Sequence, residues 1–367
     1  KQPAAKGDPA KPAPAKKAPA KKAAAKKAPA KKALPTRRAS NRKGPAIKRT
    51  PVPKTPARRS PGPPPELLAA AERATKGAFR VKPAERVVLV TDKQKLPIAE
   101  AFAQWFHHVR ADTTTYLMVE TLRPLTRLSA GLRRITEEAD LTVYVLEPRS
   151  EEVQFRRELV EAALVKGRVC MMPGITADMM SRLVNLNYAA LQDLGQKIVE
   201  RMSGAREVRV TNDRGTDVTF SVLGRRWLNA SGDISQRGLH GNLPAGECFT
   251  APVEETFHGV IHFSLIDEKP GKGMARFEKG RLAEYKGRGI AAIVDLIGRD
   301  PGGKLIGEIG IGTNRNAQIG RNLLESEKAY GSVHFGMGDS YGLGPNRSKH
   351  HYDMLVEKAT VIADGEV

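Results

Sequence analysis

The sequence predicts an α/β domain followed by an α+β domain, with a basic tail ahead of both. Three observations lead to this fold class. Residues 1–65 are rich in Lys, Ala and Pro. Residues 66–205 alternate apolar runs with amphipathic stretches of a dozen or more residues, which favours a mostly parallel sheet. Residues 206–367 consist mainly of short apolar segments separated by glycines, which favours a curved, mainly antiparallel sheet.

The tail carries most of the chain's net charge of +21. Residues 1–60 hold 20 of the 61 Lys and Arg and one of the 40 acidic residues, so the remainder is close to neutral. Such a segment has too little apolar surface to fold, and we expect disorder. Its composition resembles the Lys/Ala/Pro tails of linker histones and of some bacterial nucleoid proteins. Two interpretations stay open: non-specific binding of DNA, RNA or another polyanion through residues 1–60, or a solubilising spacer.

The sequence also bears on where the protein works. No apolar run of about 18 residues occurs, and no signal-peptide core follows the basic run. Two cysteines, Cys170 and Cys248, are too few for a disulfide framework. We therefore expect a cytoplasmic protein without a membrane partner, associated with the nucleoid only if the tail brings it there.

The α/β domain is expected to begin with a strand at 86–92. Helical patterns follow at 96–111, 124–139 and 151–167, and strands at 113–120, 141–148 and 168–174. No G-x-G-x-x-G follows the first strand, which excludes the dinucleotide-binding fingerprint there.

The α+β domain is expected to start near residues 203–207. Asn212-Asp213-Arg214-Gly215 predicts a hairpin turn, and residues 275–287 predict a second hairpin. One helix is expected at 289–300.

Acid and imidazole side chains recur in the strand-like segments of this second domain. Carboxylate plus imidazole is a ligand set for divalent cations, and six such groups suffice for two ions. An acid between glycines and apolar residues is costly to bury unless it is paired or bound to a metal. The candidates are Glu247, Glu308, Glu327, His334, His351 and Asp353.

Spacing refines this set. His351 and Asp353 are two residues apart on a predicted strand and therefore share a face, whereas His350 points the other way. His334 could instead be a hydrogen-bonded core residue unless other ligands converge on it. The glycines of segments 310–314 and 336–338 are interpreted as turn residues that let the backbone approach the site.

Two other patterns are rejected. His258 and His262 have the spacing of a zinc-protease helix, but Gly259 replaces the required Glu and the context is a strand. Cys248 lacks a local His that would activate it as a nucleophile.

Four segments together resemble the aminopeptidase T family of M29-type metallopeptidases. They are NLPAGECFTAP (242–252), GEIGIGTN (307–314), EKAYGSVHFGMG (327–338) and HYD (351–353), in this order, with Tyr341 seven residues after His334. The resemblance implies a peptide substrate and metal ligation by Glu247, Glu308, His334, His351 and Asp353, together with Glu327. It also implies a catalytic role for Tyr341, whose alternative is a rim residue after a glycine turn.

We accordingly expect two divalent ions per chain (Zn, Co or Mn), bridged by Glu308, in a metalloaminopeptidase. A homodimer stays open. His351 follows His334 by only 17 positions, and a shorter branch of the superfamily resembles ring-cleaving dihydroxypyridine dioxygenases. Those hold one Fe(II) through two His and one carboxylate, which His334, His351 and Asp353 would supply. A third alternative is a polyanion-binding protein whose peptidase-like domain is inactive.

Overall fold

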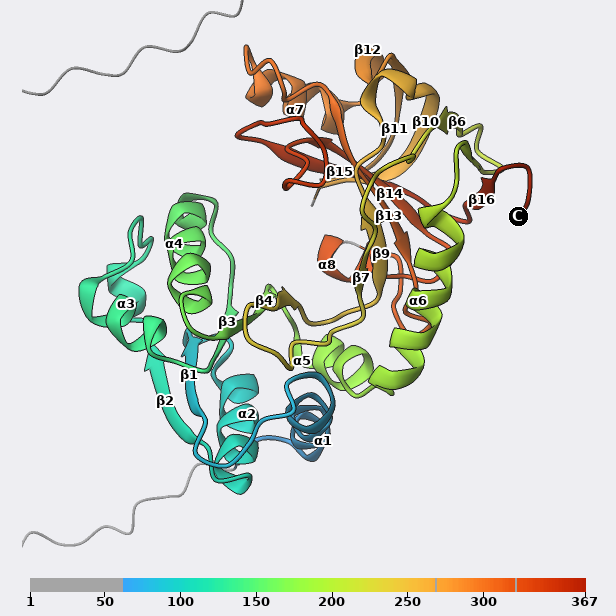
Figure 1. Cartoon of the computed structure of the whole chain (residues 1–367). Helices are drawn as coiled ribbons and strands as arrows, with labels where there is room; N and C mark the ends of the chain where they lie inside the picture. The colour runs from blue at the N-terminus through green and yellow to red at the C-terminus, as the bar shows by residue number, and fades with distance from the viewer. Residues whose placement is uncertain (1–61, 268, 321) are drawn as a thin grey trace, which may run out of the picture. The chain divides into compact units, whose positions relative to one another are not determined.

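The predicted parallel sheet forms from five strands in the order β2-β1-β3-β4-β8 (Figure 1). The structure is a computed structural model that describes residues 62–267, 269–320 and 322–367. The strands of this sheet, sheet A, are β1 (Arg86–Thr91), β2 (Asp112–Leu117), β3 (Leu141–Leu146), β4 (Arg168–Pro173) and β8 (His240–Asn242). The α/β class predicted for the amino-terminal half is confirmed.

Helices cover both faces of sheet A, which explains the uninterrupted apolar run of β1. Val87 and Leu89 pack with α1 and α2, whereas Val88 and Val90 pack on the opposite face with α3 and α4. The helices of this half are α1 (Pro65–Arg73), η1 (Ala74–Ala78), α2 (Leu96–His108), η2 (Glu120–Leu122), α3 (Ala130–Glu137), η3 (Ser150–Glu152), α4 (Val153–Leu164), α5 (Ala177–Met179), η4 (Met180–Val184) and α6 (Tyr188–Ser203).

One strand of sheet A comes from beyond the boundary expected near residues 203–207. β8 pairs in parallel with β4, and His240 lies opposite Val169. The chain therefore returns to the first sheet after starting the second. The three residues of β8 are too few to show a periodic pattern, so the sequence carried no signal for this strand.

The second sheet, sheet B, has eleven strands and is curved, and its paired strands are antiparallel (Figure 1). Its main path runs β16-β5-β6-β10-β15-β14-β13-β9-β7, and β11 and β12 extend from β10. The strands are β5 (Val208–Thr211), β6 (Asp217–Phe220), β7 (Leu228–Ala230), β9 (Glu247–Thr250), β10 (His258–Ile266), β11 (Lys269–Glu278), β12 (Arg281–Lys286), β13 (Ile306–Gly312), β14 (Val333–Gly338), β15 (His351–Val356) and β16 (Thr360–Ala363).

Both predicted hairpins are present, as β5–β6 and β11–β12, and the predicted helix is α7 (Arg288–Ile297). The short helices η5 (Glu254–Thr256) and α8 (Leu323–Ser326) complete this half.

One face of sheet B packs into a hydrophobic core. On β14, Val333, Phe335 and Met337 point into this core, where the Phe335 ring lies 6.2 Å from that of Phe220 and 5.6 Å from that of Phe257. Side chains alternate along a strand, so the residues that alternate with these three, of which His334 is the first, lie on the opposite face of sheet B. This alternation places polar side chains together on one face of a rigid sheet.

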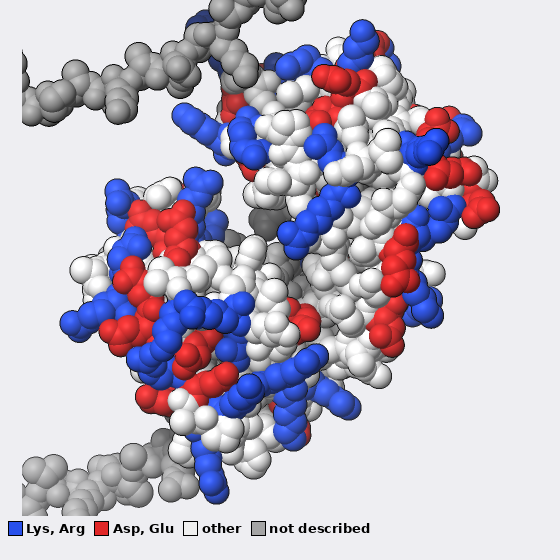
Figure 2. Space-filling view, viewed as in Figure 1, with Lys and Arg blue, Asp and Glu red and all other residues white. Residues whose placement is uncertain are grey.

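The basic tail predicted for residues 1–65 lies outside the described residues as far as residue 61. In the described part, acidic and basic side chains are interspersed on the face shown in Figure 2, as the near-neutral balance leads one to expect. No helix among the described residues is long and apolar enough to cross a membrane.

Candidate metal centre

Four neighbouring strands of sheet B bring five of the six predicted ligands to the same face. Glu247 comes from β9, Glu308 from β13, His334 from β14, and His351 and Asp353 from β15. These strands are adjacent in the order β15-β14-β13-β9. Segments more than 100 residues apart in sequence therefore contribute to one cluster of acids and imidazoles.

Glycines opposite these residues leave room for the imidazole rings. Gly310 pairs with His334, and a Cβ at Gly310 would lie 2.0 Å from the His334 ring. Gly336 lies between Glu308 and Asp353 on the neighbouring strands, and a Cβ there would lie 2.6 Å from the His351 ring.

The interpretation of segments 310–314 and 336–338 as turns is therefore wrong at these two positions. Gly310 and Gly336 are strand residues, and the missing side chain serves the ring that lies over it rather than a bend in the chain. The alternation of glycine with apolar residues resembled turn punctuation in the sequence.

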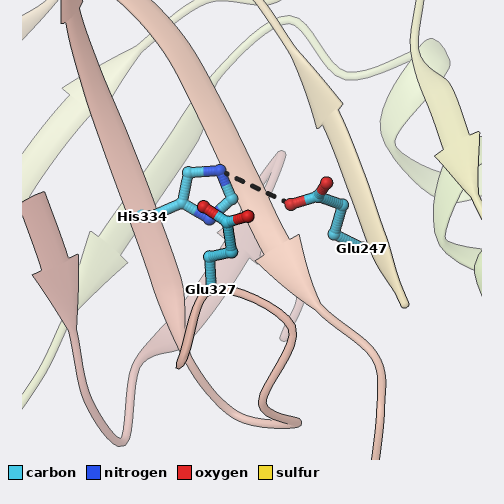
Figure 3. Close-up of side chains that lie close together, drawn as sticks. All are labelled: Glu247, Glu327 and His334. Carbon is cyan, nitrogen blue, oxygen red and sulfur yellow. Dashed lines mark ion pairs between the residues drawn. The ribbon is translucent and has the colours of Figure 1, made fainter. Parts of the chain in front are cut away.

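Glu327 joins the cluster from the segment that follows α8. Together with Glu247 and His334 it forms a group whose ligand atoms all lie within 4.8 Å of one another. Figure 3 shows the two carboxylates converging on the imidazole. These three residues thus form a group that could hold a metal ion.

Glu308 lies between the two imidazoles. Its Oε1 is 3.2 Å from His334 Nε2 and its Oε2 is 3.5 Å from His351 Nε2. One carboxylate oxygen thus faces each ring.

The His351 ring is held by its backbone surroundings. Its Nδ1 donates a hydrogen bond to the carbonyl of Asp339 at 2.7 Å, while Nε2 faces Asp353 Oδ1 at 3.2 Å. A hydrogen bond from one ring nitrogen fixes the orientation and tautomer that leave the other free for a metal.

Lys328 is the buried residue that the sequence analysis missed. Its side chain is 1% exposed, and its Nζ contacts Glu247 Oε1 at 2.8 Å and also Glu327 Oε1. The only sequence signal was its place beside Glu327, and a Lys next to a Glu is commonly a surface pair.

The pKa shifts reflect a site crowded with negative charge. Burial alone would lower the pKa of His334, but the hydrogen bond to Glu308 and the charges of Asp353 and Glu247 outweigh it and raise this pKa to about 9. Burial raises the pKa of Glu327 to about 7. Without metal, bound protons compensate the excess of carboxylates; divalent cations would take their place.

Tyr341 lies over the His351 ring, with 4.5 Å between ring centroids. The residue has a φ of +49°, and its N–H donates to Asp339 Oδ1 at 2.8 Å. It is 63% exposed. Local desolvation of the hydroxyl, together with the charges of Asp353 and Glu308, raises the pKa of Tyr341, so the phenol stays protonated and can donate a hydrogen bond.

The residues rejected from the sequence stay outside the cluster. His350 pairs with Tyr352, on the alternate face of the strand. His258 and His262 lie on β10. Burial raises the pKa of the Cys248 thiol to about 12, and its Sγ contacts the carbonyl of Gly195 at 3.3 Å, which does not suit a nucleophile.

A cavity of about 850 Å³ lies elsewhere, between α1, η1 and the start of α6. Its charged lining residues include Glu72, Arg73, Arg80 and Asp233. Acids and bases alternate there without any carboxylate–imidazole group, so size alone does not make it the functional site.

The donor set of the cluster fits a divalent metal. Four carboxylates and two imidazoles converge on one face, and only one ammonium, that of Lys328, offsets their charge among the described residues. Oxygen and nitrogen donors of this kind suit zinc, manganese, cobalt and iron.

Comparison with known proteins gives two family matches. The sequence model of the thermophilic metalloproteases (M29) matches residues 187–366, and that of the 2,5-dihydroxypyridine 5,6-dioxygenases matches residues 70–267. No curated protein matches the sequence.

Two solved structures share the fold. The 2,5-dihydroxypyridine dioxygenase of Pseudomonas putida KT2440 is 16% identical, with a TM-score of 0.63 over 82% of this chain and 96% of that one. Wild-type AmpT of Thermus thermophilus is 18% identical, with a TM-score of 0.62 over 81% of this chain and 94% of that one. The two family matches overlap at residues 187–267 and together span residues 70–366. The chain therefore belongs to the group of related proteins, M29-type metallopeptidases and dihydroxypyridine dioxygenases, that these two models describe.

Proposed function

We propose that this protein is a metal-dependent aminopeptidase with a dinuclear centre. The observation that carries the proposal is the position of Glu308, whose two oxygens each face a different imidazole. Glu247, Glu327 and His334 form the ligands on one side of Glu308, and His351 and Asp353 those on the other. Zinc, cobalt or manganese would suit these donors.

Two divalent ions held there would supply a water of lowered pKa and polarise the scissile carbonyl. The protein's own side chains do the rest. Glu308 holds the ligands on its two sides in a fixed relative position. The Asp339 carbonyl fixes the orientation of the His351 ring. The Tyr341 hydroxyl donates a hydrogen bond to the oxyanion that develops when the peptide carbonyl is attacked.

The alternative is a ring-cleaving dioxygenase with one Fe(II) held by His334, His351 and Asp353. The dioxygenase match and the shared fold favour it. However, that match ends at residue 267, before all three residues, whereas the metalloprotease match spans all six candidate ligands. A single-iron triad also leaves Glu247 and Glu327 without a role in metal binding.

Anaerobic metal analysis joined to two activity assays tests the proposal. Protein purified without added metal and then loaded with Zn²⁺, Co²⁺ or Mn²⁺ is expected to hold two ions per chain and to release amino-terminal residues from peptides. A protein that holds one iron per chain and opens a dihydroxypyridine ring, but cleaves no peptide, would contradict the proposal and support the alternative.

A further inference from the structure

The Lys328 side chain is buried within the candidate metal centre, although lysine is not among the candidate metal ligands. Its ammonium donates to Glu247 Oε1 and Glu327 Oε1, the two acids that complete the group with His334. A buried lysine normally loses its charge unless carboxylates pair with it. Here the carboxylates of Glu247 and Glu327 pair with it.

The ammonium uses one oxygen of each carboxylate and leaves the other. Glu247 Oε1 is taken by Lys328 at 2.8 Å, while Glu247 Oε2 lies 3.7 Å from His334 Nε2. A carboxylate oxygen that accepts a hydrogen bond from an ammonium is a weaker ligand for a cation than the free oxygen beside it. A charge-assisted hydrogen bond from a buried ammonium is strong enough to keep one carboxylate oxygen from binding the cation.

Lys328 is not a mobile arm. Its N–H donates to the carbonyl of Glu325 at 3.0 Å, and its carbonyl accepts from the N–H of Asn314 at 2.8 Å. The side chain therefore starts from a fixed backbone position and reaches both carboxylates from one side.

We propose that Lys328 is a positioning residue that restricts Glu247 and Glu327 to one ligand oxygen each. The cation bound between them and His334 then has a low coordination number and retains an open position for water or substrate, as catalytic sites require. This inference rests on the proposed dinuclear function.

Cobalt reports on the coordination number directly, because four- or five-coordinate Co²⁺ absorbs visible light far more strongly than six-coordinate Co²⁺. Metal-free wild-type protein and the variant Lys328→Met are titrated with Co²⁺ and followed by visible absorption and calorimetry. In Lys328→Met we expect a weaker visible band, because both carboxylates can chelate. Its affinity for one of the two ions should rise by about 10-fold, on the scale seen for changes to groups that hydrogen-bond metal ligands, because the variant removes a positive charge beside that ion and frees two carboxylate oxygens.

Three further variants make the test specific. Lys328→Arg retains a cation with several donors and should restore part of the wild-type band. Lys328→Gln, which keeps an N–H donor and loses the charge, replaces Lys328→Met if that variant does not fold, and should weaken the band in the same direction. Lys197→Met, on the exposed surface of α6, should behave as wild type.

The outcomes separate this inference from the proposed function. A folded Lys328→Met that binds two Co²⁺ with the wild-type spectrum and affinity would overturn the role of Lys328 and leave the dinuclear centre standing. A wild-type protein that binds one Co²⁺, with Lys328→Met binding two, would overturn both, because the ammonium would then stand in place of the second ion.

Discussion

Side chains that are neighbours in sequence at this site have different surroundings, because successive residues of a strand point to opposite faces of the sheet. Glu308 and His351 face the centre, whereas His350, one residue earlier, faces Tyr352. Neighbouring histidines in sequence thus have unlike surroundings, which allows a matched comparison at the scale of one residue.

We expect Glu308→Gln to lower the metal content from two ions to one or fewer and to abolish turnover, because an amide NH₂ cannot replace a ligand oxygen. His351→Ala should have the same effect, whereas His350→Ala should retain metal and activity. Metal analysis, circular dichroism and peptide turnover check this. Two ions in Glu308→Gln would contradict a bridging role.

Tyr341→Phe should keep both ions and slow turnover by roughly 10²–10³-fold, the loss usual for one oxyanion donor. Tyr330→Phe is the control, since Tyr330 is 51% exposed and stacks under Arg315. Equal turnover numbers for the two variants would assign Tyr341 to the rim of the site.

The strands act as units at the next scale, because each carries one face in the hydrophobic core and one face with candidate metal ligands. On β13 and β14 the face that carries Glu308 and His334 otherwise carries glycines, and Gly310 provides the space that the His334 ring occupies. The sheet therefore positions the candidate ligands in two ways: its strands carry them, and its glycines leave space for their side chains.

Gly310→Ala should displace the His334 ring, since the new Cβ would lie 2.0 Å from it. We expect lost metal affinity and a fall of about 1–3 kcal/mol in the free energy of unfolding, typical of overpacking. Gly131→Ala on α3, where a Cβ meets nothing within 4 Å, should instead gain about 0.5–1 kcal/mol. Denaturant titrations and metal analysis compare the two. Unchanged metal binding in Gly310→Ala would show that the ring can move without loss.

For the whole molecule, a buried ion network at the carboxyl edge of sheet A contributes to stability. Arg123 donates to Asp92 at 2.8 Å and to Glu152 at 2.5 Å, and all three side chains are at most 1% exposed. Burial opposes ionisation of Glu152, but Arg123 outweighs it and lowers the pKa of Glu152. In open α/β sheets, ligands commonly bind in the crevice at the carboxyl ends of the strands, where the strand order reverses. In this protein the side chains of Arg123, Asp92 and Glu152 occupy that position beside β1.

Arg123→Met should cost about 3–5 kcal/mol at pH 7, because it leaves buried carboxylates unpaired. A carboxylate whose folded pKa is lowered contributes stability above its unfolded pKa, about 4.3 for Glu, and loses it as the pH falls through the folded pKa. The difference from wild type should therefore shrink below about pH 4. Arg127→Met, whose side chain is 77% exposed, should change stability by less than about 1 kcal/mol. Urea titrations at both pH values test the pair.

The tail also belongs to this scale. Deleting residues 1–60 removes 20 basic residues and one acid and leaves a nearly neutral chain. DNA affinity and its salt dependence, about −0.9 in log–log slope per phosphate neutralised, should then disappear, while peptide turnover should persist. Binding with an unchanged slope in the truncated protein would place a polyanion surface on the described residues.

Local patterns in the sequence determined the classes of both sheets, the two hairpins, α7 and the types of ligand residue, because periodicity and turn chemistry act over a few residues. Tertiary structure decided the rest. β8 joins sheet A through a partner strand about 70 residues away in sequence. Glu308 lies between His334 and His351 only because β13, β14 and β15 pair in one register. Lys328 becomes part of the candidate centre because the fold brings its ammonium within hydrogen-bonding distance of Glu247. Such contacts join distant segments, and no local pattern encodes their geometry.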